Sequence, residues 1–79
     1  MAIKDRERRD RIAGKLRAHR AEARLSQVRV AEVVDMDKSS ISKYEQGAAC
    51  MDVETAWEMA DLYGVSLDEL VGREHQLGD

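Results

Sequence analysis

Apolar residues recur three or four positions apart in five stretches of the chain, and short polar connections separate these stretches. This spacing predicts five helices. The first is expected to begin between Asp5 and Asp10 and to end near Ala23. Its inward-facing stripe consists of Ile12, Ala13, Leu16 and Ala23.

Two short helices joined by a tight turn are predicted within residues 25–47. Ser26 is placed to cap the first, because its hydroxyl can accept from backbone N–H groups that the first helical turn leaves unpaired. Asp35 interrupts the apolar pattern, and Asp37 supplies a second capping side chain. The second helix is therefore expected to span residues 38–46.

This second helix has two unlike faces. By i, i+3 and i+4 spacing, one face is polar and basic and the other is directed inward. The polar face carries Lys38, Ser39, Ser42, Lys43 and Gln46, and the inward face carries Ile41, Tyr44 and Glu45. Two short helices with such a polar face on the second match the helix-turn-helix arrangement, whose second helix enters the DNA major groove.

Two further helices are predicted towards the C-terminus. Asp52 is placed to cap a helix that ends at Tyr63, immediately before Gly64. Ser66 and Glu69 have the spacing of a capping box and predict a short fifth helix. The apolar residues at helical spacing in the fourth helix are Val53, Ala56, Met59, Ala60 and Tyr63.

Length and composition support a single all-α domain. The chain has 79 residues, proline and phenylalanine are absent, and charged residues make up 37%, which favours helices with solvated faces over a sheet. We expect a charged N-terminal extension at residues 1–10, a compact five-helix core at 11–71 and a short polar tail at 72–79.

The composition also indicates in which cellular compartment the protein is expected and which cofactors it is expected to lack. Cys50 is the only cysteine, and no charged-then-apolar secretion signal opens the chain. No apolar run approaches the roughly eighteen residues that a membrane span needs, so we expect a cytoplasmic protein with no membrane partner. Cys50, His19 and His75 lack the spacing of zinc ligands, and neither a metal nor another cofactor is expected.

The charge distribution is uneven. The formal net charge is −3, yet residues 1–47 carry 12 Lys and Arg against 8 Asp and Glu, giving +4, whereas residues 48–79 carry 1 against 8, giving −7. The basic half contains the polar helix and is expected to face phosphate. The alternative is that both halves are merely solvated helix faces.

Several separated motifs resemble the lambda-repressor-like family, of the Cro and Xre type. The similarity extends over residues 12–71 and implies a five-helix fold with the helix-turn-helix at helices 2 and 3. Asp35 stands where the family usually has glycine, but aspartate is among the residues that adopt left-handed backbone geometry. The matching residues are Leu25, Ser26, Gln27, Ala31, Glu32, Ile41, Ser42, Glu45, Gly47 and the segment GVSLDEL at residues 64–70.

Lys38, Ser39 and Lys43 are the candidates for base contact, because the N-terminal part of a recognition helix approaches the base edges most closely. Lysine donates to guanine O6 and N7, so at least one guanine is expected in each half-site. The alternative is that these side chains touch only phosphate or water. The candidates for phosphate contact are Gln27, Ser40, Ser42 and Arg17, and the resemblance implies that Gln27 also braces the recognition helix.

Glu45 lies one turn beyond Ile41 on the inward face, where an unpaired carboxylate is costly. Arg20, one turn beyond Leu16 on the first helix, is the expected partner, and the resemblance implies the same structural ion pair. The alternative is that Glu45 points to solvent.

Large apolar residues near the C-terminus raise the question of oligomeric state. Trp57, Leu67 and Val71 are candidates for a homodimer interface, whereas Leu70 is expected in the core. The basic N-terminal extension is expected to be either a solvated helical end or an arm that touches the DNA backbone or enters a minor groove.

The resulting hypothesis is a sequence-specific regulator of transcription that binds double-stranded DNA as a homodimeric repressor of a palindromic operator. The alternative is an antitoxin-like protein-interaction module that binds DNA mainly for autoregulation, its acidic half facing a basic partner. An enzyme is not expected, because no acid, base and nucleophile group together in the sequence pattern.

Overall fold

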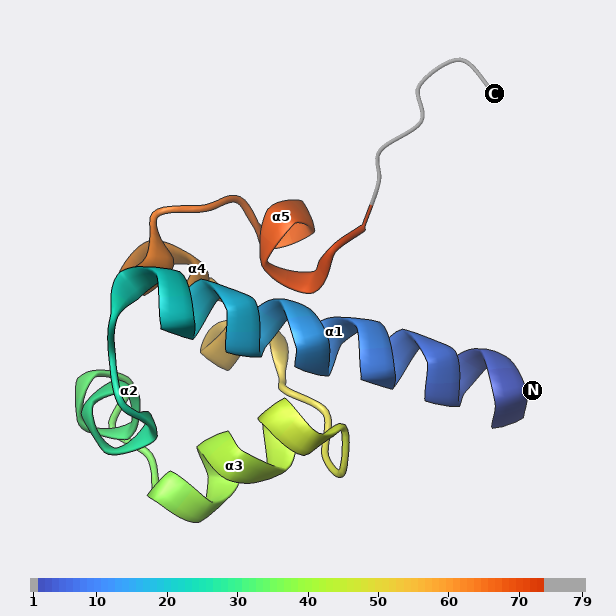
Figure 1. The fold of residues 1–79 in the computed structure, drawn as a ribbon, viewed down its shortest axis with the longest axis horizontal. Coiled ribbons are helices and arrows are strands. Elements are labelled where there is room, and N and C mark those ends of the chain that lie inside the picture. Colours follow the sequence, from blue (N-terminus) through green and yellow to red (C-terminus); the bar gives the residue numbers. More distant parts are fainter. Residues whose placement is uncertain (1, 74–79) are drawn as a thin grey trace.

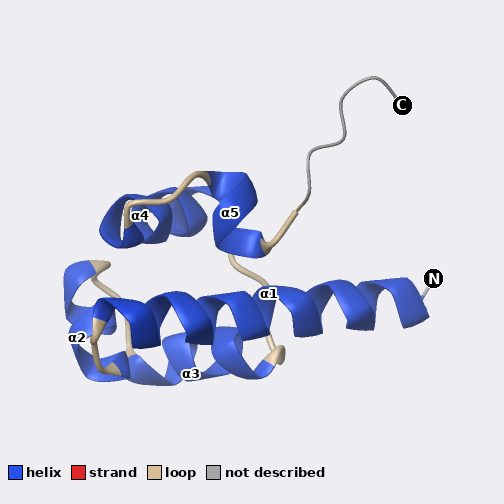
Figure 2. Cartoon of the chain, turned by 45° about the horizontal axis from the view of Figure 1, so that its top comes forward, coloured by secondary structure: helices blue, strands red, loops and turns tan. Residues whose placement is uncertain are grey.

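The computed structural model describes residues 2–73, with side chains from residue 6 onward. This part of the chain is all-helical and contains five helices (Figures 1 and 2), so the predicted fold class is confirmed. The helices are α1 (Ala2–Ala23), α2 (Gln27–Val33), α3 (Lys38–Gln46), α4 (Val53–Tyr63) and α5 (Leu67–Val71).

Helix α1 runs through the middle of the fold. The α2–α3 pair lies along one side of it and the α4–α5 pair along another, in both views (Figures 1 and 2). The core where these layers meet consists of Leu16, Val30, Ala31, Val34, Ile41, Met59, Ala60 and Leu70. No helix in the described residues is long and apolar enough to cross a membrane.

The prediction for the start of α1 was wrong, because the helix begins at Ala2 and not between Asp5 and Asp10. The segment contains no glycine or proline before Gly14, and its charges alternate in sign at helical spacing, so nothing in it stops a helix. The N-terminal extension is therefore helical and not a loose arm.

Caps define the ends of the later helices. The Ser26 hydroxyl accepts from the Arg29 amide at 3.0 Å, and Ser66 and Glu69 form the predicted capping box. Asp37 does occupy the N-cap of α3, but its side chain makes no capping hydrogen bond, which corrects the expectation for this residue. The Asp37 carbonyl instead accepts from the amides of Ser40 and Ile41 at 3.0 and 3.3 Å.

The turn between α2 and α3 contains a left-handed residue. Asp35 has a φ of 56°, the conformation expected where aspartate replaces glycine. The Met36 amide donates to the Ala31 carbonyl at 2.8 Å and closes the turn. The helix-turn-helix geometry therefore forms without a glycine at this position.

Two apolar residues assigned to inward stripes lie on the surface. Ala23 is exposed because α1 ends there and the chain turns at Arg24, whose φ is 59°. Val53 is 72% exposed because it is the first residue of α4 and precedes the residues of this helix that pack into the core. Thr55 is buried in that first turn, and its amide donates to the Asp52 carboxylate at 2.8 Å.

Candidate nucleic-acid interface

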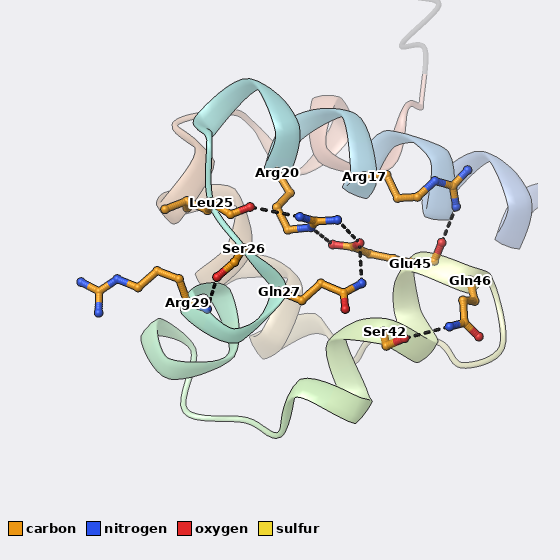
Figure 3. A network of polar contacts seen from close by, with 9 residues as sticks. All are labelled: Arg17, Arg20, Leu25, Ser26, Gln27, Arg29, Ser42, Glu45 and Gln46. Carbon is orange, nitrogen blue, oxygen red and sulfur yellow. Dashed lines mark hydrogen bonds and ion pairs between the residues drawn. The ribbon is translucent and has the colours of Figure 1, made fainter.

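The polar face of α3 lies on the surface. Its residues Lys38, Ser39, Lys43 and Gln46 are exposed and Ser42 is half-buried, as is the neighbouring phosphate candidate Ser40. The Gln46 side-chain amide donates to the Ser42 hydroxyl one turn away, at 2.8 Å (Figure 3). This face therefore exposes ammonium groups and hydroxyls that a ligand could contact.

The opposite face of α3 is fixed by a buried carboxylate. Glu45 is 2% exposed, and Arg20 of α1 donates to both of its oxygens, Nε to Oε2 at 2.7 Å and Nη2 to Oε1 at 3.0 Å (Figure 3). The Gln27 amide of α2 donates to Glu45 Oε1 at 3.1 Å. One carboxylate thus joins α1, α2 and α3, in a two-pronged arginine geometry that is strong and directional.

Arg20 has a second partner in the connection that follows α1. Its Nη1 donates to the Leu25 carbonyl at 3.0 Å. The connection that leads into α2 is therefore held by the same guanidinium. Hydrogen bonding to Glu45 raises the pKa of Arg20 above its ordinary value, against the lowering effect of burial. A guanidinium is effectively always protonated in proteins, and the bond to Glu45 favours its charged form further.

Arg17 lies on the same side of α1 and donates through Nη1 to the backbone carbonyl of Glu45 (Figure 3). Sequence reasoning placed Arg17 among the phosphate contacts and missed this bond. Arg17 and Arg20 are three residues apart and share a helix face, but this spacing does not reveal how closely α1 approaches the end of α3. The bond holds the C-terminal part of α3 against α1.

Tyr63 of α4 lies close to this network. Burial, followed by the negative charge of Glu45, raises the pKa of Tyr63 to about 12, whereas the charge of Arg20 acts in the opposite direction. Its ring stacks on that of His19, with centroids 5.8 Å apart. Its hydroxyl makes no hydrogen bond to any protein group that the structure describes.

Strongly alkaline solution is expected to destabilise the protein through Tyr63. The raised pKa means that the folded state holds the phenolic proton more tightly than the unfolded chain. This stabilisation is full below pH 10 and is lost as the pH rises towards about 12. A Tyr63→Phe variant should therefore lose less stability between about pH 9.5 and 11.5, as measured by urea unfolding at each pH. An equal loss in both proteins would contradict the assignment.

The residues assigned to a dimer interface lie outside the α2–α3 pair. Trp57 on α4 is 61% exposed and Leu67 on α5 is 40% exposed, whereas Val71 is half-buried against the core. Leu70, expected in the core, is fully buried. Within residues 2–73, no group of three His, Cys, Asp or Glu side chains is arranged to hold a metal ion.

The site has three features that allow a comparison with known families. They are the two short helices, the tight turn at Asp35 and the exposed polar face of α3. A family model for a helix-turn-helix domain matches residues 11–71. The chain belongs to the helix-turn-helix domain family. Helix-turn-helix domains bind DNA through their second helix, and α3 holds that position here. Comparisons with curated proteins and with solved structures give no match.

Proposed function

We propose that this helix-turn-helix protein is a sequence-specific repressor of transcription that binds a palindromic operator as a homodimer. The observation that carries the proposal is the contrast between the two faces of α3. One face is polar, basic and exposed, and the other is locked to α1 and α2 through Glu45. A helix presented in this way can enter a major groove in a fixed orientation.

Base contacts are assigned to Lys38, Ser39 and Lys43. All three side chains are exposed, and they lie in the first two turns of α3. Lysine ammonium groups can donate to O6 and N7 of guanine, and a serine hydroxyl can donate or accept. At least one guanine in each half-site is therefore part of the proposal.

Phosphate contacts are assigned to Gln27, Ser40, Ser42 and Arg17. The Gln27 amide uses one N–H for Glu45, which leaves its second N–H for a phosphate oxygen. Arg17 likewise uses only Nη1 on the Glu45 carbonyl. Both side chains would brace α3 from one side and hold the DNA backbone from the other.

The dimer is assigned to α4 and α5. Trp57 is 61% exposed, and Leu67 is 40% exposed on the neighbouring helix. Burial of such side chains against a second copy would stabilise a domain of this size. Two-fold symmetry would then place the two α3 helices in successive major grooves, about 34 Å apart.

A Trp57→Glu variant is expected to be monomeric and still folded. The substituted side chain lies on the surface, so the charge costs little in the monomer but would be desolvated in the dimer. Sedimentation equilibrium measures the mass, and circular dichroism checks the fold. A Glu58→Lys variant, at the exposed neighbouring position, controls for a general change of surface charge. A dimeric Trp57→Glu protein would remove Trp57 from the interface.

Selection of bound sequences from a random duplex pool tests the function itself. A palindromic motif with half-sites about one helical turn apart, bound by two chains, is the expected result. Absence of any enriched motif would contradict sequence-specific repression. Tight association with a co-purified protein in that case would favour the antitoxin-like alternative, in which the exposed acidic side chains of α4 face a basic partner.

A further inference from the structure

The N-terminal turns of α1 have no role in the helix-turn-helix described so far. The family match begins at residue 11, whereas α1 begins at Ala2. In both views these turns project beyond the end of α3 (Figures 1 and 2). They carry four arginines against two carboxylates within residues 6–11, and residues 6–10 are all exposed.

The two sides of α1 have different neighbours. Arg11 donates to the Gly72 carbonyl at 3.3 Å, and His19 Nε2 lies 2.9 Å from the Glu69 carbonyl, so this side faces α5. Arg17 and Arg20 bond to Glu45, so their side faces α3. Direction along a helix repeats almost unchanged after 7 or 11 residues.

This repeat places the remaining arginines. Arg6 lies 11 residues before Arg17, and it therefore points towards the side on which α3 lies. Arg8 lies 7 residues before Lys15, which packs next to Gly72 at the end of α5. Arg8 also borders a surface hollow with Arg11, Val71 and Arg73. Arg6 and Arg8, two residues apart in the sequence, thus lie on different sides of the same helix.

The C-terminal end of α3 abuts α1 at Arg9 and Asp10, one turn after Arg6. A Cβ atom at Gly47 would lie 3.3 Å from Asp10 Oδ1 and 3.6 Å from the Arg9 carbonyl oxygen, and Gly47 has a φ of 76°. Arg9 lines a shallow groove with Tyr44, at the end of α3, and Cys50, in the following connection. Arg9 therefore lies at the point where α3 leaves the surface of α1, and Arg6 lies one turn nearer the N-terminus.

The dimensions of DNA place phosphate at this point. Helix α3 has nine residues and is about 14 Å long, whereas the major groove is about 12 Å wide. If the N-terminal half of α3 contacts base edges, its C-terminal end reaches the edge of the groove, which is formed by the sugar-phosphate backbone. Arg9 adjoins that end of α3, and Arg6 lies one turn before it on α1.

We propose that Arg6 and Arg9 form a second phosphate-binding site, which contacts the DNA backbone outside the base pairs read by α3. The inference rests on the proposed function and adds to it a flanking contact made by the helical extension. The Asp10 carboxylate lies on the same side and opposes an anion, so both arginines are needed for a net positive site. Such a contact adds affinity without base preference.

The test compares DNA affinity over a range of salt concentrations, using the selected operator with about 10 extra base pairs on each side. Each phosphate contact contributes about 0.9 to the slope of log K against log salt. The doubly substituted Arg6→Ala, Arg9→Ala protein should therefore show a slope smaller by about 1.8 per chain, with an unchanged base preference. A protein with lysine at both positions should keep most of the slope.

Arg8→Ala is the matched control, because it removes the same charge from the same turns but on the side towards α5. It should keep the slope of the parent chain. Trimming the duplex to the selected base pairs should lower the slope of the parent chain and leave that of the double variant nearly unchanged. Circular dichroism and sedimentation equilibrium establish that all variants share one fold and one oligomeric state.

Three results would overturn the proposal. The double variant could retain the parent slope, it could lose no more than Arg8→Ala does, or it could lose affinity because its dimer dissociates. The last result would show that these arginines meet the acidic surface of a second copy. Failure of the proposed function looks different, because the parent chain itself would then show no preferred DNA sequence.

Discussion

An Arg20→Ala variant is expected to unfold more than about 10 °C below the parent chain. The substitution leaves the Glu45 carboxylate, which is 2% exposed, without its main partner. Removal of one member of a buried ion pair costs about 3 kcal/mol or more. In a domain of this size, each kcal/mol lowers the melting temperature by roughly 4–8 °C. Differential scanning calorimetry measures the shift.

Arg29→Ala is the matched control for this prediction. Arg29 also pairs with a glutamate, Glu32, at 3.2 Å, but both side chains are about 60% exposed. Exposed pairs of this kind contribute at most about 0.5 kcal/mol. The Arg29→Ala protein should therefore melt within a few degrees of the parent chain. Equal melting temperatures for both variants would show that the Arg20–Glu45 pair stabilises the fold no more than the exposed Arg29–Glu32 pair does.

A Lys43→Ala variant is expected to bind the selected operator about 1–3 kcal/mol more weakly and to lose its preference at one base position. The ammonium group is exposed on the polar face of α3 and is assigned to a guanine. The expected loss corresponds to roughly 5- to 150-fold in Kd. Fluorescence anisotropy with the operator and its single-base variants measures both effects.

Lys15→Ala removes the same charge from α1, on the side that packs next to Gly72. It should bind the operator with nearly the affinity of the parent chain. A Lys43→Ala protein that weakens equally on every sequence would make Lys43 a phosphate contact and leave base recognition to the neighbouring side chains. The two outcomes differ in the pattern of losses across base variants, and not only in the size of the loss.

Most of the fold could be predicted because its boundaries are local. Ser26, Asp52 and Ser66 each accept from the backbone amide three residues ahead, and this chemistry depends only on nearby sequence. The Asp35 turn is local in the same sense. The start of α1 was misjudged because charged residues alone do not mark a helix end. Asp5 and Asp10 are residue types that can cap a helix, yet α1 continues through both of them to Ala2.

The polar network was only partly predictable. Glu45 stands in an apolar stripe, so its need for a cation can be inferred from spacing. The donation from Arg17 depends on how closely α1 approaches the end of α3, which is a matter of tertiary packing. Sequence spacing equally cannot decide which apolar residues remain on the surface. Val53 and Ala56 belong to one stripe, yet the first is 72% exposed and the second packs against the core.

The attachment of three helices to one carboxylate has a consequence for how sequences are discriminated. With α1, α2 and α3 joined at Glu45, the recognition surface has little freedom to adjust to an imperfect site. Adaptation is then left to the duplex, whose resistance to bending and twisting depends on its base steps. Under the proposed function, operators should accordingly differ in affinity through base pairs that no side chain touches, with flexible steps such as TA favoured between the half-sites.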